Sequence, residues 1–161
     1  MLNNKSKRRI VREKVLQILY AYEMNKESLE PLSSEILAEI TEENDREFAR
    51  ELIRKVRSNS DELDKRIIGR VTNWGMSRIA LIDKILLRIG ICEILYFPDI
   101  PPKVSINESI EIAKDFSTAG SGKFINGILD AILTELKESG KLNKTGRGLV
   151  EETISKTDTK K

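Results

Sequence analysis

The amino-acid sequence predicts an all-α fold. Apolar residues recur at helical spacing through most of the chain, and no stretch alternates long enough to indicate a sheet. Capping-box patterns and a proline-rich run at 98–102 divide this pattern into segments. With 161 residues, of which 39% are hydrophobic, the chain is long enough to form one domain with a hydrophobic core.

The first half of the chain predicts four helices. In the first, at about 9–22, one stripe contains Val11, Val15, Ile18, Leu19 and Tyr22. A short second helix is expected from Ser33 or Ser34 to Ile40. A polar residue followed three positions later by an acid is typical of a helix start. The pairs Asn44 with Glu47 and Asn59 with Glu62 therefore predict helices at about 45–57 and 60–68.

The second half predicts three more helices, which brings the total to about seven. A helix at about 77–96 is apolar nearly all round, as expected of a central helix covered by others. The prolines of 98–102 end it. Ser105 with Glu108 is a further capping box, and the last helix is expected at 123–137. The apolar period then disappears, so we expect a domain at 1–140 and a disordered tail at 141–161.

Composition excludes several classes of function. The chain has one cysteine and no histidine, so an internal disulfide, the usual zinc ligand sets and histidine-based catalysis are excluded. We therefore expect no metal and no cofactor. Enzymatic activity is less expected but stays open from composition, because Asp, Glu, Lys and Tyr side chains could still catalyse. The sequence has neither an apolar run of membrane-spanning length nor a signal-peptide pattern, and it predicts a cytoplasmic protein.

Basic residues concentrate at the start of the chain. Residues 1–22 carry six basic and one acidic side chain, whereas residues 23–136 carry fifteen basic and twenty-one acidic ones. Helical spacing places Lys5, Arg8, Arg9 and Arg12 beside one another, with Tyr20 further along the same flank. This pattern favours binding of a phosphate backbone. A solvated basic face, with Tyr20 in the core, is the alternative.

The start of the last helix combines a cation, a ring and an amide in Lys123, Phe124 and Asn126. Such groups suit single-stranded RNA, whose bases offer faces for stacking and edges for hydrogen bonds. Gly127 leaves bare backbone where a ligand could approach. In the alternative interpretation Phe124 belongs to the core, Asn126 is an exposed helix residue and Gly127 permits close helix packing. Trp74 is expected to anchor a connection.

Several ordered motifs run through roughly residues 7–136. They are Arg8-Arg9-x-x-Arg12, Gln17-x-Leu19-Tyr20, Asn73-Trp74, Arg78, Leu87-Arg88, Glu93, Ile100-Pro101-x-Lys103-Val104-x-Ile106-Asn107-Glu108-x-x-Glu111-x-Ala113-Lys114-x-Phe116 and Lys123-Phe124-x-Asn126-Gly127-x-Leu129-Asp130. In these motifs and their order the sequence closely resembles the NusB transcription antitermination family. Two departures are Val15, where the family usually has a small alanine, and the extension after Lys137.

The resemblance implies a fold of two packed helical bundles and a function in binding without chemistry. Family members pair with the small-subunit ribosomal protein that doubles as NusE. The pair binds single-stranded boxA RNA in ribosomal RNA transcripts and joins the RNA polymerase antitermination complex, which then resists termination. The implied RNA-binding residues here are Lys7, Arg8, Arg9, Arg12, Tyr20, Lys123, Phe124 and Asn126.

The surface for the partner protein is less defined by sequence. Asp83, Arg88 and Glu93 are charged residues within the apolar helix at 77–96, and such groups are seldom buried without a partner. Pairing with neighbouring helices is one interpretation. The other, which the resemblance favours, is a docking face that includes Asp83, Leu86 and Glu93.

Two other functions remain open from the sequence alone. The chain could be an RNA-recruiting module that acts in trans with an RNA methyltransferase, because such enzymes carry a similar helical module. It could also be a helical DNA-binding protein, although its basic residues open the first helix and not the second helix of a helix-turn-helix.

Overall fold

The computed structural model describes residues 5–26, 30–71 and 76–150, and within these ranges it contains helices and no strand. The chain forms two compact units, residues 1–58 and 59–161. The expectation of an all-α fold with two helical bundles is confirmed. Asn73 and Trp74 lie outside the described residues, so the expected anchoring role of Trp74 stays a prediction.

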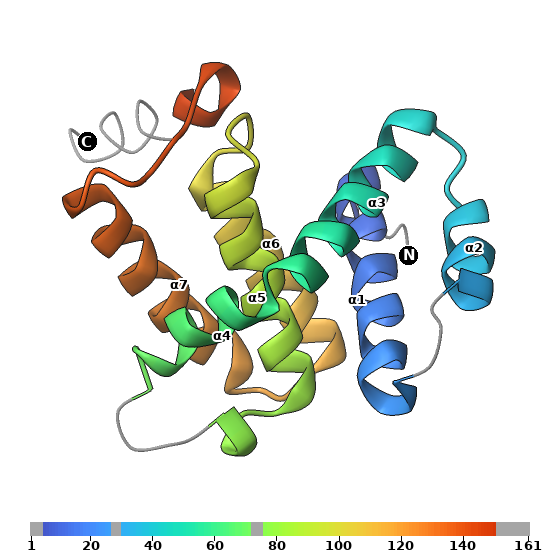
Figure 1. Ribbon diagram of the computed structural model, residues 1–161, viewed down its shortest axis with the longest axis horizontal. Coiled ribbons are helices and arrows are strands. Elements are labelled where there is room, and N and C mark those ends of the chain that lie inside the picture. Colours follow the sequence, from blue (N-terminus) through green and yellow to red (C-terminus); the bar gives the residue numbers. More distant parts are fainter. Residues whose placement is uncertain (1–4, 27–29, 72–75, 151–161) are drawn as a thin grey trace. The chain divides into compact units, whose positions relative to one another are not determined.

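The first unit contains α1 (Lys7–Asn25), α2 (Glu30–Ala38) and α3 (Glu43–Ser58) (Figure 1). The side chain of Ser6 caps α1 and accepts a hydrogen bond from the backbone N–H of Arg9 at 3.1 Å. The helix ends where Lys26 adopts a left-handed conformation (φ 56°) and its N–H bonds to the carbonyl of Tyr22.

Helix α1 packs against both α2 and α3. Its apolar stripe is buried, and so is the stripe of α3 that contains Phe48, Leu52 and Val56. The predicted cap at Asn44 is wrong, because α3 begins at Glu43. The helix instead opens on Glu43 and Asp45, at the end where the helix dipole favours negative charge.

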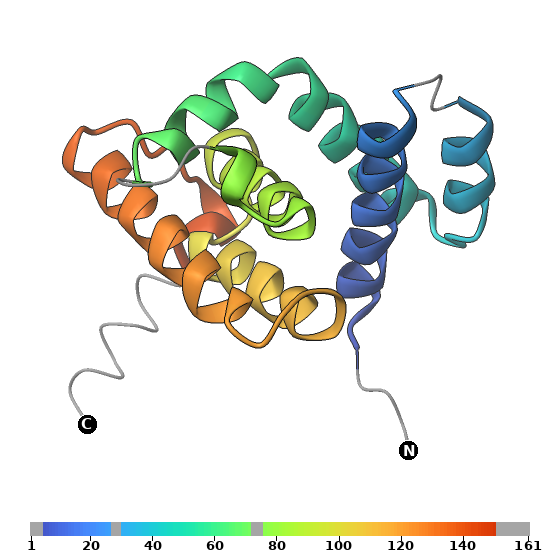
Figure 2. The same ribbon diagram turned by 90° about the horizontal axis from the view of Figure 1, so that it is seen from below.

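The second unit contains α4 (Ser60–Ile68), the 3₁₀ turn η1 (Met76–Arg78), α5 (Leu81–Tyr96), α6 (Pro102–Phe116) and α7 (Ser121–Glu138). Helix α5 contacts α4, α6 and α7, which surround it in Figure 2. Its buried side chains come from nearly every side of the helix: Ile85, Leu86, Leu87, Ile89, Ile91, Cys92 and Ile94. The expected central helix is therefore confirmed.

Gly90 explains how closely α5 and α7 approach. A methyl group added at Gly90 would lie 2.8 Å from a terminal carbon of Leu129 and 3.1 Å from the hydroxyl of Ser109. Both neighbours are buried. The absence of a side chain at Gly90 thus lets α6 and α7 pack directly on the central helix.

Two of the expected capping boxes in the second unit behave differently from prediction. Asn59 does stand at the N-cap of α4, but its side chain makes no capping hydrogen bond. Ser105 lies inside α6, which begins at Pro102, and its hydroxyl donates to Glu93 at 2.9 Å. Proline at the first helical position needs no hydrogen-bond partner, which is why α6 begins earlier than its serine.

The segment after α7 is ordered as far as residue 150. The side chain of Lys144 donates to the carbonyls of Glu93 at 3.1 Å and Phe97 at 2.8 Å, and so caps the C-terminal end of α5. A second 3₁₀ turn, η2 (Gly146–Leu149), follows, and the N–H of Thr145 bonds to the carbonyl of Pro98 at 3.0 Å. The prediction of a disordered tail is therefore wrong for residues 141–150. Residues 151–161 lie outside the described part.

Burial of Lys144 has a consequence for stability. Desolvation lowers the pKa of its ammonium group from 10.5 to about 8. Between these two values the unfolded chain binds more protons at this position than the folded chain. The contribution of Lys144 to the free energy of unfolding must therefore rise with pH across this window.

We expect the difference in unfolding free energy between the wild type and Lys144→Met to shift in favour of the wild type from pH 8 to pH 10. Chemical denaturation of both proteins at several pH values measures this difference. Because every other titrating group is common to the two proteins, a difference that does not vary with pH would contradict the lowered pKa.

Candidate nucleic-acid interface

The predicted basic residues of the first unit lie in the first half of α1. Lys7 is well exposed, with 76% of its side-chain surface accessible, and Arg8 and Arg9 are half-buried. Tyr20 lies further along the helix and is exposed. The alternative that Tyr20 belongs to the core is therefore wrong. These four side chains remain accessible to a ligand.

Acidic residues outside α1 pair with this basic segment. Lys7 forms an ion pair with Glu42, Arg8 with Asp45 at 2.8 Å, and Lys14 with Glu39. The hydrogen bond to Glu42 raises the pKa of the Lys7 ammonium above 10.5. The positive charge counted over residues 1–22 is thus partly compensated within the unit, which a count along the sequence could not reveal.

Phe48 of α3 orients two of the arginines. The guanidinium of Arg8 lies 4.2 Å from the centre of the Phe48 ring, and that of Arg12 lies 5.2 Å from it. Both distances are within the range of a cation–π interaction. Asp45 and Phe48 are therefore residues of the site that the sequence interpretation missed. Their spacing of three residues on a predicted helix was the available signal.

Arg12 differs from the other predicted RNA-binding residues of α1. It is only 4% exposed, so the expectation that it projects beside Arg8 and Arg9 on a solvated face is wrong. A helical wheel gives the direction in which each side chain leaves α1. It contains no information on Phe48 of another helix, whose ring covers the guanidinium of Arg12. A role of Arg12 in RNA binding stays a prediction.

In the second unit, Lys123, Phe124 and Asn126 lie in the first turns of α7. Lys123 and Asn126 are exposed and Phe124 is half-buried. A methyl group added at Gly127 would meet nothing within 4 Å among the described residues, so close helix packing does not explain this glycine. The four residues form an accessible strip with a cation, part of a ring, an amide and bare backbone.

The predicted RNA-binding residues thus form two groups, each on its own unit. Lys7, Arg8, Arg9 and Tyr20 are accessible on α1 of the first unit, with Arg12 buried beside them. The strip on α7 belongs to the second unit. The first group supplies charge, which phosphates require, and the second supplies groups suited to bases.

The residues predicted to bind a partner protein are buried. Leu86 is fully buried and Asp83 is 6% exposed. Asp83 accepts hydrogen bonds from the hydroxyls of Ser117 at 2.6 Å and Ser121 at 2.8 Å. These contacts join α5 to the junction of α6 and α7, so Asp83 acts inside the unit.

Glu93 and Arg88 also have partners within the second unit. Glu93 is 1% exposed and accepts the hydrogen bond from Ser105. Arg88 forms a two-pronged ion pair with Asp64 of α4, at 2.7 and 3.0 Å. The interpretation that these groups pair internally is therefore correct for Arg88. Asp83, Leu86 and Glu93 are buried, so their side chains form no exposed face in this structure, and the expectation that they take part in docking a partner stays a prediction.

Other types of site find little support in the described residues. No group of three or more cysteine, aspartate or glutamate side chains there is placed to hold a metal ion. None of the described helices is both long and apolar enough to cross a membrane.

The chain is similar to known proteins over most of its length. The NusB family model matches residues 9–134. The transcription antitermination protein NusB of Chloroherpeton thalassium is 47% identical over 146 residues, which cover 89% of this chain and 69% of the relative. The protein of the same name from Salinibacter ruber is 44% identical over 90% of this chain and 92% of its own length.

Solved structures give the same result. NusB of T. maritima superposes with a TM-score of 0.76 at 39% identity and covers 81% of this chain and 93% of its own. A structure of antitermination factors NusB and NusE in complex with dsRNA superposes with a TM-score of 0.72 over 80% of this chain and 97% of its own, but at 23% identity this likeness shows the fold alone. With the family model and two relatives at 44–47% identity in agreement, the chain belongs to the NusB family.

Proposed function

We propose that this protein is a transcription antitermination factor. In this proposal it binds single-stranded boxA RNA of ribosomal RNA transcripts together with a NusE-type ribosomal protein, and it helps RNA polymerase to resist termination. Membership of the NusB family supports the proposal. The observation on the molecule that carries it is the cationic first half of α1, with Lys7, Arg8 and Arg9 accessible to a phosphate backbone.

The ion pairs of α1 are compatible with RNA binding. The pairs of Lys7 with Glu42 and of Arg8 with Asp45 leave 76% and 42% of the basic side chains accessible. The pair of Lys7 with Glu42 is exposed to solvent, and such pairs contribute little to stability, so a phosphate can replace the carboxylate of Glu42 at small cost. Phe48 keeps Arg8 at the surface in a defined position, which reduces the entropy lost on binding.

Arg12 has a supporting role in this proposal. Its burial against Phe48 fixes the aromatic ring on which Arg8 also lies. It therefore positions the contacting arginine and does not bind phosphate itself. The strip Lys123, Phe124, Asn126 and Gly127 on α7 supplies base contacts, in which an aromatic face stacks on a base and an amide reads its edge.

In this proposal the NusE-type partner binds outside the buried side chains of α5. Membership of the NusB family supports this pairing, since a structural neighbour is named as NusB and NusE in one complex. Asp83, Leu86 and Glu93 then act indirectly, because they hold α5 against the helices around it.

The central test is RNA binding in the presence of the cognate NusE protein. We expect the two proteins to co-purify, and we expect the pair to bind a single-stranded boxA-like RNA more tightly than a duplex DNA of equal length. Fluorescence anisotropy with labelled oligonucleotides measures both affinities. Equal affinity for the two nucleic acids, or tighter binding to the duplex, would contradict the proposed function.

Variants of the α1 arginines test whether each side chain contributes to RNA affinity or to thermal stability. The double variant Arg8→Gln/Arg9→Gln should bind boxA-like RNA more weakly, with the logarithmic salt slope smaller by up to about 0.7 for each lost phosphate contact. Its melting temperature is measured alongside, because loss of Arg8 also removes the ion pair to the buried Asp45. Lys65→Gln on α4, an exposed position that removes one charge elsewhere, is the control.

Arg12→Gln should show the opposite pattern. Because the buried guanidinium packs on Phe48, its removal should lower the melting temperature while leaving the salt slope unchanged. A normal melting temperature together with a reduced slope would show instead that Arg12 contacts phosphate directly.

Phe124 provides a test of the strip on α7. If the half-buried ring stacks on a base, Phe124→Ala should cost about 1–3 kcal/mol of RNA affinity, whereas Phe124→Tyr should retain most of it. Thermal melting and RNA affinity are measured on the same variants. A large loss of stability with normal affinity in the folded fraction would exclude stacking and assign Phe124 to the core.

A further inference from the structure

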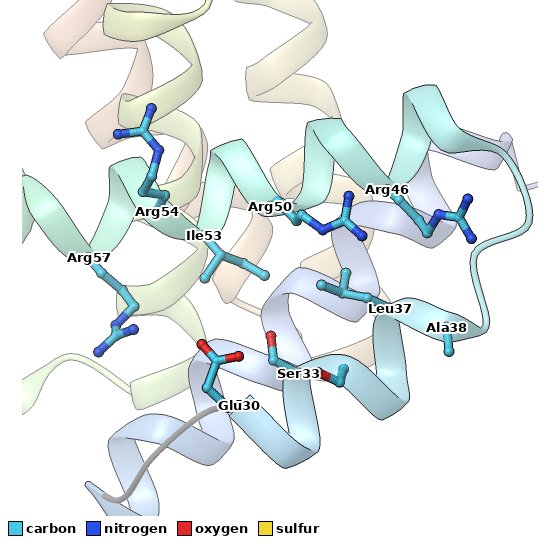
Figure 3. A pocket seen from close by; sticks show the side chains of 10 residues that line it. Glu30, Ser33, Leu37, Ala38, Arg46, Arg50, Ile53, Arg54 and Arg57 are labelled. Carbon is cyan, nitrogen blue, oxygen red and sulfur yellow. The ribbon is translucent and has the colours of Figure 1, made fainter.

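A second cationic surface lies in the first unit, away from the predicted residues of α1. A hollow of about 550 Å³ is bounded by α2 and α3, and most of its charged lining comes from one row of α3 (Figure 3). Arg46, Arg50, Arg54 and Arg57 belong to this lining, while Ser33 and Ser34 of α2 line the other side. Neither the proposed function nor the motifs of the sequence account for this hollow.

Helical spacing explains why the four arginines form a row. They follow one another at intervals of four, four and three residues, so they stay within about 80° around the axis of α3. From Arg46 to Arg57 the row extends about 16 Å at 1.5 Å per residue. Phe48, Leu52 and Val56 occupy the buried side of the same helix, which turns the row away from the apolar core.

The side chains are not equivalent. In Figure 3 the guanidinium groups of Arg50 and Arg57 turn towards α2, whereas that of Arg54 turns away. Arg54 is held by Glu51 at 2.7 Å. Arg54 also belongs to the lining, but its guanidinium is engaged by Glu51. We call the other three arginines of the lining, Arg46, Arg50 and Arg57, the α3 arginine row.

The guanidinium groups of the α3 arginine row have N–H donors that could still bind a ligand. Among the described residues, Arg50 has only long ion pairs, to Glu43 at 3.4 Å and Glu47 at 3.6 Å. Arg46 pairs with Glu43, but its Nε atom is buried and makes no hydrogen bond. Arg57 lies 4.4 Å from the centre of the Tyr22 ring, and no carboxylate in the described ranges pairs with it. A buried donor without a partner is costly, which favours an acceptor from a ligand.

The chemistry of the lining favours an extended anion with oxygen acceptors. Guanidinium groups bind phosphate in a fixed two-pronged geometry, and the hydroxyls of Ser33 and Ser34 can donate to the same oxygens. Glu30 is the one acid in the lining, so the charge facing the hollow stays positive. A single phosphate cannot reach both ends of a row of about 16 Å, whereas a nucleic-acid backbone can.

We propose that the hollow between α2 and α3 binds the phosphate backbone of single-stranded RNA outside the boxA element. This inference rests on the proposed function, because it extends the RNA already assigned to α1. Continuity with α1 supports it. Tyr22 of α1 contacts Arg57, so the α3 arginine row adjoins the helix that carries Lys7, Arg8 and Arg9.

Two RNAs test the proposal: a boxA-like core alone, and the same core with about ten added nucleotides on each side. The triple variant Arg46→Gln/Arg50→Gln/Arg57→Gln should bind the short RNA like the wild type. On the long RNA its logarithmic salt slope should fall by about 2, which is about 0.7 for each of three contacts. Its affinity there should fall at least about tenfold at low salt.

Lys55→Gln is the matched control. Lys55 lies on the same helix, pairs with Glu51 at 3.4 Å and does not line the hollow, so its loss removes one charge without touching the site. It should leave binding of both RNAs unchanged. Circular dichroism melting of every variant verifies that helix α3 remains folded.

The outcomes separate this inference from the proposed function. If the wild type fails to bind the short RNA, the proposed function fails. If the wild type binds both RNAs with equal affinity and slope, the α3 arginine row is excluded from RNA binding while the proposed function stands. If the folded triple variant loses both RNAs equally, the row does not serve RNA outside the boxA element, and the proposal is overturned. A triple variant that binds the long RNA normally but loses affinity for a poly-glutamate peptide would identify the hollow as a peptide site and overturn the proposal.

Discussion

Burial of α5 is the constraint on which the second unit depends. A helix that is apolar on nearly every side must be covered, and α4, α6 and α7 provide that cover. The few polar groups of α5 then need partners inside the unit. Asp83 accepts hydrogen bonds from the hydroxyls of Ser117 and Ser121, and Glu93 accepts one from the hydroxyl of Ser105. These bonds fix the junction from which α7 starts, and with it the strip at Lys123–Gly127.

The first unit is organised by a different contact, between α1 and α3. The same α3 residues that pack against α1 also set the position of its cations. Asp45 pairs with Arg8, and Phe48 supports Arg8 and Arg12. Helix α3 therefore provides part of the apolar core and also the residues that hold the arginines of α1 in position. Its opposite side carries the α3 arginine row, so α3 connects the two cationic surfaces of the unit.

Much of this architecture could be predicted from the sequence, since apolar periodicity depends on local geometry alone. It located α1 and α5 to within a few residues and identified α5 as central. Capping predictions were less accurate. Asn44 and Ser105 match the cap pattern, yet both lie inside helices, because acidic residues or a proline start those helices earlier.

The candidate site was predicted only in part, for a related reason. Which charges pair across helices depends on tertiary contacts that spacing does not contain. Burial of Arg12 and of Asp83 results from neighbours distant in sequence, as does the pairing of Lys7 with Glu42. The four arginines of α3 follow one another in the sequence at intervals of four, four and three. The meaning of this spacing requires the hollow that α2 completes.

The segment at 141–150 changes where the domain ends. Apolar periodicity stops near residue 140, but the chain returns to the end of α5 through backbone contacts and one lysine. Gly148 lies so close to the carbonyl of Pro98 that no side chain fits between them. Removal of everything after α7 would expose the last carbonyls of the most buried helix. Hydrogen bonds to the main chain therefore attach this segment to the folded structure. A domain boundary placed where the apolar periodicity stops would exclude residues that belong to that structure.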